Sequence, residues 1–456
     1  MSAIDDVLKY IATNEIRWID LQFVDIKGSL HRTTISNRKI EEDTFGSGVH
    51  AADLNRVFGQ SEQGELALLP DPDTLARLPW EPSTVRFMCN VNISKTKERF
   101  LKDSRYIAER METNLSAAGI KNARVGTEVE CFIFDTITQD RSSPGRGSGT
   151  LLDSREAPWA PSALSNTEKG ALYPQPFDSM YAARTQIGET LEDSFGVLLN
   201  SHSHGAAQTA QQTFDLGEKS LTSAGDAVHT LKFVIRNLAT AVNAVSTFMP
   251  YPVAGQPGNS FNTSVSFWKA SDNNLFYDGK DDYAQVSQTG RYFIGGVLEH
   301  AAALSLFTAP TPNSYRKLAV EDKVVGWSNS SRNALVRVPY LKKNVKETKR
   351  IVYTGGDPSC NPHLCNAMIV AAGLDGIKNK IDPGDPVEQE GKKKRTEKEL
   401  PGSLLEAIAA LESDTKFIKG VVPAELLGDY LDLKLRQHKE AQGAITNHEL
   451  EKYINV

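Results

Sequence analysis

The chain has 456 residues, of which 40% are hydrophobic and 24% are charged, so it is long enough for one large and one smaller globular domain. Its formal net charge of −6 at pH 7 argues against a nucleic-acid-binding surface. No apolar run approaches the roughly 20 residues of a membrane-spanning helix, and the charged start MSAIDDVLKYIATNE is no signal peptide, so we expect no membrane contact. The four cysteines form no CxxC pair, which is typical of reduced core residues and predicts a cytoplasmic protein.

The first part of the chain has the alternating pattern of a β-sheet. In IDLQFVDIKGSLHRTTIS, Ile19, Leu21 and Phe23 fall on one face of a strand, and DIKG predicts a turn into a second strand. The prolines of LLPDPDTLARLPW favour an extended path, and VRFMCNVNIS indicates a further strand. We predict that residues 1–98 form a small sheet-rich domain.

Helical and strand patterns alternate over residues 99–456. A repeat of Ile107, Met111 and Leu115 predicts a helix over 103–119. In the strand ARVGTEVECFIFD, Glu128 and Glu130 share one face. Further helices are predicted at 186–199, 224–247 and 292–305, and polar strands at 201–214 and 259–268. The predicted fold class is therefore α+β.

Eight stretches spread over nearly the whole chain, in order, resemble the type I glutamine synthetase family. They are WIDLQFVDIKGSLHRTTI, LLPDPDTLARLPW, VGTEVECFIFD, LKFVIRNLATAVNAVSTFMPYP, NSYRKL, RNALVRVP, DPSCNPHLCNAMIVAAGLDGI and LPGSLLEAIAALESD. The resemblance implies an N-terminal β-grasp domain over 1–98 and a catalytic domain over 99–456, with a curved antiparallel sheet flanked by helices. It also implies a homo-oligomer, a dodecamer built as a double ring, whose active sites lie between neighbouring subunits.

The resemblance also implies a metal site, and the chain departs from it. Glutamine synthetases activate the side-chain carboxylate of glutamate with ATP, using divalent ions held by carboxylates and one histidine. Glu128 and Glu130 in GTEVE match the first two acidic ligands of the family. The other ligand positions carry no carboxylate; they are occupied by His204, Gln211, Asn262 and Val352.

The positions that bind substrate in the family are changed as well. Thr354 stands for a substrate-binding arginine, and Phe45 stands for the acid that binds ammonium. Residues expected to bind substrate in the altered cleft are Gln211, Asn262, Ser264, Lys317, Arg332, Arg337, Arg350 and Thr354. Because the cleft keeps cations and loses acids, we expect an anionic ligand; alternatively, these arginines pair with acids across subunit interfaces.

Two histidines complete the predicted catalytic set of Glu128, Glu130, His202 and His204. His202 and His204 alternate on one strand, and the family places that strand near the two glutamates. Together they would serve as an acid–base pair or hold one divalent ion at Glu128, Glu130 and His204. The alternative is a hydrogen-bonded remnant of the ancestral site.

From these departures the sequence predicts that the chain makes no glutamine. Neutral oxygens replace carboxylates poorly around a hard dication, so we expect no cofactor, none of the usual two-metal set, and no use of Mg-ATP. The cleft would act on a small amine, amide or carboxylate without the two-metal ATP step. The alternatives are a catalytically silent ring that serves as scaffold, metabolite sensor or partner of an active synthetase, and an ATP-dependent γ-glutamyl-amine ligase with altered metal use.

Overall fold

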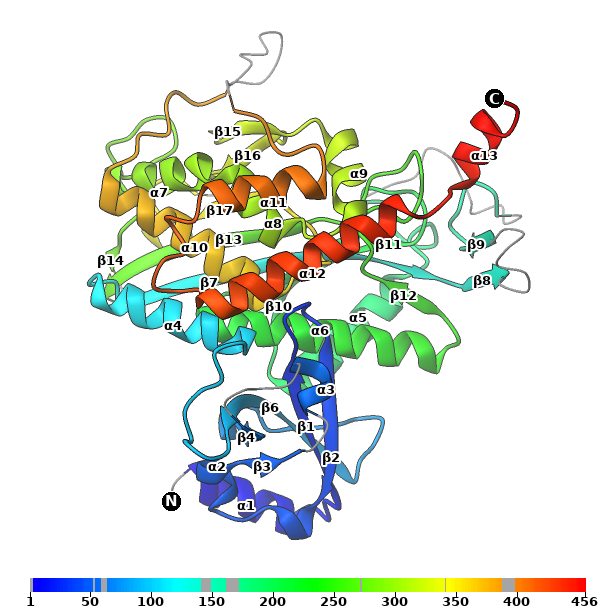
Figure 1. The fold of residues 1–456 in the computed structure, drawn as a ribbon, viewed down its shortest axis with the longest axis vertical. Helices are drawn as coiled ribbons and strands as arrows, with labels where there is room; N and C mark the ends of the chain where they lie inside the picture. The colour runs from blue at the N-terminus through cyan, green and yellow to red at the C-terminus, as the bar shows by residue number, and fades with distance from the viewer. Residues whose placement is uncertain are drawn as a thin grey trace.

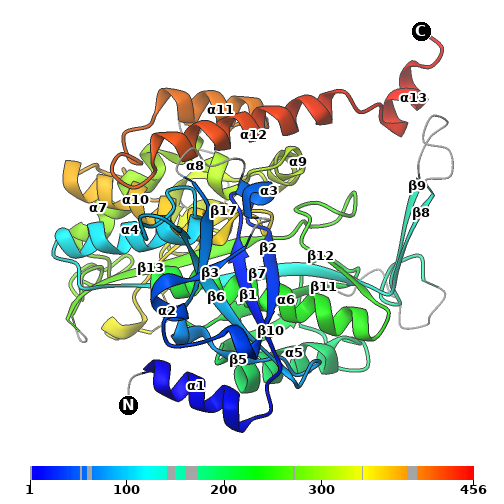
Figure 2. The ribbon, with the colours of Figure 1, turned by 60° about the horizontal axis from the view of Figure 1, so that its bottom comes forward.

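The computed structural model describes residues 3–51, 54–58, 64–140, 149–160, 172–270, 273–340, 342–387 and 398–456. A small N-terminal sheet lies against a larger lobe in which helices pack on a long sheet (Figure 1). The hairpin β8–β9 and the C-terminal helix α13 extend to one side of this larger lobe in both views (Figures 1 and 2). Among the described helices, none combines the length and apolar character needed to cross a membrane.

The N-terminal sheet has the strand order β2-β1-β6-β4-β3, with β5 paired to β6. Its strands are β1 (Trp18–Val24), β2 (Leu30–Ser36), β3 (Val49–His50), β4 (Leu66–Pro70), β5 (Ala76–Arg77) and β6 (Thr84–Ile93). The helices α1 (Ala3–Thr13), α2 (Thr44–Ser47) and α3 (Leu54–Phe58) accompany it. The predicted burial of Ile19, Leu21 and Phe23 is confirmed, and Asp20 is buried too because it accepts hydrogen bonds from Arg32 and Thr34.

The large sheet has the order β10-β11-β7-β13-β17-β16-β15, and all neighbours are antiparallel except β15 and β16. Its main strands are β7 (Asn122–Phe134), β10 (Leu199–His204), β11 (Gln211–Leu216), β13 (Phe261–Ala270), β15 (Val324–Ser328), β16 (Ala334–Arg337) and β17 (Ile351–Gly356). Shorter strands are β12 (Val245–Thr247) and β14 (Asn273–Asn274), and a separate hairpin pairs β8 (Thr136–Asp140) with β9 (Gly149–Asp153). The predicted α+β class is confirmed.

Helices cover one face of this sheet and bury its apolar side chains. They are α4 (Ser104–Ala117), α5 (Tyr181–Phe195), α6 (Leu221–Ala241), α7 (Gln288–Glu299), α8 (Ala301–Thr308), α9 (Pro312–Glu321), α10 (Pro362–Asn379), α11 (Leu404–Ser413) and α12 (Ala424–Gln442), while α13 (Asn447–Tyr453) extends away from the lobe. Val129 and Cys131 of β7 and Phe214 of β11 belong to the same buried cluster as residues of α4, α6 and α10. The residues that alternate with them therefore lie on the opposite, polar face.

Three predicted helices differ from the observed ones. The helix predicted at 224–247 is α6, which ends at Ala241, and the residues of β12 that follow form a strand instead. The helix predicted at 186–199 is α5, which ends earlier because Gly196 adopts the left-handed conformation, with φ of 61°. The helix predicted at 292–305 is divided into α7 and α8 at His300. The His300 ring is held there by Asp414 at 2.6 Å and Asp375 at 3.0 Å. Neither contact could be inferred from helical periodicity.

Candidate functional site

Glu130 lies at the centre of the polar face of the large sheet. Its carboxylate accepts a hydrogen bond from the Ser260 backbone N–H at 2.7 Å and longer ones from Gln211 Nε2 and Thr213 Oγ1, both at 3.4 Å. Burial raises the pKa of Glu130 to about 7, against the opposing effect of the Ser260 hydrogen bond. Glu130 therefore changes charge near neutral pH.

Glu128 occupies the same face two residues earlier on β7. The register sets it opposite Asp215 of β11 on one side and Asn262 of β13 on the other. Asn262 Nδ2 donates a hydrogen bond of 2.7 Å to Glu128 Oε1. Ser264, two residues after Asn262, donates to the Gly126 carbonyl at 3.3 Å. The structure thus brings together Glu128, Glu130, Asn262 and Ser264 on one face of the sheet.

Gln211 lies on this face too, but it is fully buried and its polar atoms are engaged. Its Oε1 accepts from the Ala207 N–H at 2.7 Å, and its Nε2 donates to the Gly258 carbonyl at 2.9 Å and to Asn259 Oδ1 at 3.2 Å. These contacts fix the turn before β11. Thr213, which the sequence analysis did not single out, is the residue directly opposite Glu130.

Cationic side chains gather at the other side of the polar face. Lys317 is fully buried and donates to Glu321 at 3.1 Å and to the Gly356 carbonyl at 3.2 Å. Lys323 donates to Thr354 Oγ1 at 3.2 Å, and burial lowers the pKa of Lys323. Thr354 in turn donates to the Ala334 carbonyl at 3.1 Å. Thr354 therefore holds the Lys323 ammonium in place.

The three predicted arginines differ in their surroundings. Arg337 lies opposite Val352 on the polar face, and its buried Nε has no hydrogen-bond partner within the described ranges. Arg350 approaches Glu218 at 4.0 Å, and its Nε likewise has no partner among the residues described. Arg332 is exposed. Two of the three thus retain donors that an anion could occupy.

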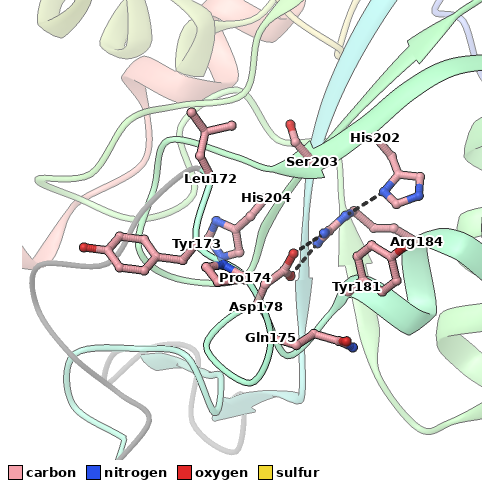
Figure 3. A pocket seen from close by; sticks show the side chains of 10 residues that line it. All are labelled: Leu172, Tyr173, Pro174, Gln175, Asp178, Tyr181, Arg184, His202, Ser203 and His204. Atoms are coloured by element: carbon pink, nitrogen blue, oxygen red, sulfur yellow. Dashed lines mark hydrogen bonds and ion pairs between the residues drawn. The ribbon is translucent and has the colours of Figure 1, made fainter.

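The histidines lie on the opposite face of the sheet. Ser203 lies opposite Thr213, which lies opposite Glu130, so His202 and His204 must face the other way. They line a cavity of about 380 Å³ together with Arg184 and Asp178 (Figure 3). His202 Nδ1 accepts a hydrogen bond from Arg184 Nε at 3.3 Å.

His204 is paired with a glutamate that the sequence analysis did not identify. Its Nε2 lies 3.1 Å from Glu156 Oε2, and its Nδ1 lies 2.9 Å from the Gly205 carbonyl. Burial lowers the pKa of His204, but the hydrogen bond and the charge of Glu156 outweigh it and raise that pKa overall. The structure therefore does not bring His202 and His204 together with Glu128 and Glu130, because the register separates them by a sheet face.

Two further acids on or near the polar face were missed. Asp215 follows Gln211 and Thr213 at spacings of two, so strand alternation alone could have placed it beside Glu128. Burial raises the pKa of Asp215 and of Glu218, although Arg350 opposes the shift at both. Phe45, by contrast, packs in the N-terminal core with its ring 5.8 Å from Phe87.

The described residues contain no group of three or more histidines, cysteines, aspartates and glutamates arranged to hold a metal ion. Glu128 and Glu130 nevertheless provide two carboxylates on one face, next to the neutral oxygens of Asn262 and Thr213. Mg²⁺ in nucleotide-dependent enzymes commonly keeps water ligands and takes one or two protein carboxylates plus substrate phosphates. The residues present fit such a site.

Two family models match the chain: "Glutamine synthetase, beta-Grasp domain" over residues 15–93 and "Glutamine synthetase, catalytic domain" over 101–453. A glutamine synthetase of Sulfolobus acidocaldarius is 39% identical over 96% of this chain and 95% of its own length. Those of Frankia alni and Rhizobium meliloti are 33% and 32% identical, covering 94% and 96% of this chain and the same shares of their own.

Solved structures agree on the fold. A Plasmodium falciparum glutamine synthetase superposes with a TM-score of 0.87 at 20% identity, covering 99% of each chain. A ligand-free GmaS superposes with a TM-score of 0.82 at 23% identity, covering 98% of this chain and 99% of the other. The predicted β-grasp and catalytic folds are confirmed.

The relatives overturn the functional prediction made from the sequence. Proteins named glutamine synthetase match over nearly the whole chain, which contradicts both the expected absence of glutamine formation and a cleft reused without ATP. It also contradicts the expectation that Mg-ATP is not used. The error has a physical reason. The residues Gln211, Asn262 and Val352 supply no carboxylate, but Mg²⁺ does not need one from them, because two protein carboxylates suffice when substrate phosphates complete its coordination shell.

Proposed function

We propose that this chain, which belongs to the glutamine synthetase family, joins ammonia to the side-chain carboxylate of glutamate at the expense of ATP. The observation that carries the proposal is the 39% identity to a glutamine synthetase over 96% of this chain and 95% of the relative. The two glutamates of β7, which share the polar face of the sheet, support it.

Each part of the polar face has a task in this reaction. Glu128 and Glu130 would hold a divalent ion, which when bound neutralises phosphate charge. Arg337 and Arg350 offer unpartnered guanidinium nitrogens to an anionic group of ATP or glutamate. Lys323, held by Thr354, adds a further positive charge beside them.

We further propose that the metal site is degenerate, in the sense of being weak. Two carboxylates and the neutral oxygens of Asn262 and Thr213 attract a dication less than a full carboxylate set does. Glutamine formation should require both ATP and Mg²⁺ or Mn²⁺, stop with EDTA, and need about tenfold more metal than the Sulfolobus acidocaldarius relative for half-maximal rate. The measurement is glutamine formed at increasing metal concentration, with both enzymes at one pH. If folded, oligomeric protein forms no glutamine at any metal concentration, the proposed function fails.

The pH dependence follows from Glu130. Because its pKa is raised to about 7, its carboxyl is neutral below that pH and ionised above it. At limiting metal the rate should therefore rise with pH through about 7, and saturating Mg²⁺ should move the midpoint to lower pH because the ion favours the carboxylate. The free energy of unfolding depends on pH in the opposite direction. Because the folded state holds the Glu130 proton more tightly than the unfolded chain does, this group stabilises the folded state at low pH, and the stabilisation is lost as the pH rises through about 7. A rate at limiting metal that falls between pH 6 and 8 would contradict the assignment.

We propose a cytoplasmic dodecamer with domains over 1–98 and 99–456. Four buried free cysteines support a reducing compartment, and the hairpin β8–β9 and α13 extend from the body as interface elements do. Ile445, Ile454 and Val456 near the C-terminus expose apolar side chains that a second subunit would cover. Light scattering at micromolar concentration should give about 600 kDa, twelve times the 50.0 kDa chain. A monomer under these conditions would refute the assembly.

A further inference from the structure

A cavity of about 440 Å³ lies where the N-terminal sheet meets the larger lobe, and neither Glu128 nor Glu130 lines it. Its walls come from the turn between β1 and β2, from α6, from the segment 247–250, from the start of α9 and from the segment 358–360. The side chains used below are Ser29, Lys232, Arg236, Phe248, Asn313 and Ser359.

Two positive side chains of α6 face this cavity. Lys232 and Arg236 are four residues apart and so lie on one side of the helix. Both contact the same ring: Lys232 Nζ lies 5.5 Å and the Arg236 guanidinium carbon 5.2 Å from the centre of Phe248. Like charges at this spacing repel one another unless a counter-charge lies between them.

The described residues that line the cavity include no aspartate or glutamate. Lys232 is buried, and within the described part of the chain its ammonium donates one hydrogen bond, to the Pro358 carbonyl at 2.6 Å. The Arg236 guanidinium contacts the Phe248 ring but makes no hydrogen bond or ion pair to any described residue. The charge of Asp357 acts on Lys232, but Asp357 lies outside the lining and accepts a hydrogen bond from the Ser359 N–H at 2.9 Å. The two cations thus lack a counter-ion in the cavity.

We propose that this cavity is a binding site for a small oxyanion, either a phosphate or a carboxylate, held between Lys232 and Arg236. Ser29, Asn313 and Ser359 add neutral polar groups around it, and Phe248 provides an apolar wall. The volume of about 440 Å³ is large enough to admit a phosphate ion or a short dicarboxylate. Burial also lowers the pKa of Lys232 to about 8, as expected for an ammonium whose charge is not neutralised. Because residues of both lobes line the cavity, the anion would strengthen the contact between them.

Calorimetric titration of the full chain, with ionic strength held constant by chloride, tests the site. Phosphate and succinate are titrated in separate arms, which distinguishes the two sources of the oxyanion. The variants are Arg236→Gln, Lys232→Met, Arg337→Gln to remove an arginine of the polar face, and Arg436→Gln as an exposed charge-matched control on α12. Arg236 is exposed, so its replacement should not disturb folding.

We expect Arg236→Gln to raise the Kd of one binding event about tenfold while Arg436→Gln and Arg337→Gln leave that event unchanged. Lys232→Met should raise the same Kd by a similar factor. If Lys232→Met does not fold, the result for Arg236→Gln is sufficient to test the site. The proposal would be overturned if wild type, Arg236→Gln and Arg337→Gln bound the anions equally. It would also be overturned if no binding event weakened on replacement of Arg236. Binding is measured without ATP or glutamate, so its failure is distinguishable from failure of the ligase assay, in which Arg236→Gln should retain the wild-type rate.

Discussion

Replacing Glu130 with glutamine is expected to reduce the rate of glutamine formation at pH 8 by about 100-fold or more. The side chain keeps its shape, and the donor Ser260 stays 2.7 Å from an oxygen, but the negative charge that would face a divalent ion is removed. The free energy of unfolding should stay the same or rise at this pH, since a buried ionised carboxyl is replaced by a neutral amide. Initial rates at saturating metal, together with urea midpoints, measure both effects.

Glu189→Gln supplies the control for this experiment. Glu189 is an exposed residue of α5, and its replacement removes the same charge far from the polar face, so its rate should stay within about twofold of wild type. Should Glu130→Gln also remain within threefold, the polar face would not be the site of the reaction, whatever reaction the chain performs.

Arg105→Met is expected to cost about 3–5 kcal/mol of stability, because it breaks the ion-pair network that joins the two lobes. Arg105 of α4 is 5% exposed and donates to Asp226 of α6 at 3.0–3.2 Å, to Asp71 at 2.5 Å and to Asn90. Burial would raise the pKa of Asp226, yet Arg105 and then His363 hold it well below its usual range. Without Arg105, the buried Asp226 carboxylate would keep, among the described residues, only the His363 hydrogen bond of 2.9 Å.

The matched control lies on the same helix. Arg110 is only half-buried and donates to the Gly420 carbonyl at 3.0 Å, so Arg110→Gln should change stability by about 0.5 kcal/mol or less. Combining Arg105→Met with Asp226→Asn should recover part of the loss, because the stranded charge is removed with its partner. Urea unfolding of the four proteins at pH 7 gives the values, and a loss below about 1 kcal/mol for Arg105→Met would show that the network does not hold the lobes together.

Local pattern in the sequence predicted most of the long strands and helices, the α+β class and the shared face of Glu128 and Glu130, but it merged β10 and β11 into one strand over 201–214. These features depend on residues close in the chain, whose alternation or four-residue spacing is fixed by backbone geometry. The local pattern did not predict the end of α5, which a left-handed glycine sets. It also did not predict the division at His300, where two carboxylates distant in the sequence hold the ring. The arrangement of these elements into a β-grasp domain and a catalytic domain was predicted from the family resemblance, which extends over nearly the whole chain.

Only the tertiary structure decided which side chains meet. Alternation shows that His202 and His204 share a face, but the register of β10 on β11 and of β11 on β7 decides which face it is. A shift of one residue exchanges the two faces, and that register is set by the burial of Phe214 with Val129 and Cys131 in the core. The histidines consequently lie with Glu156 and Arg184, while Thr213 and Asp215 lie with the two glutamates.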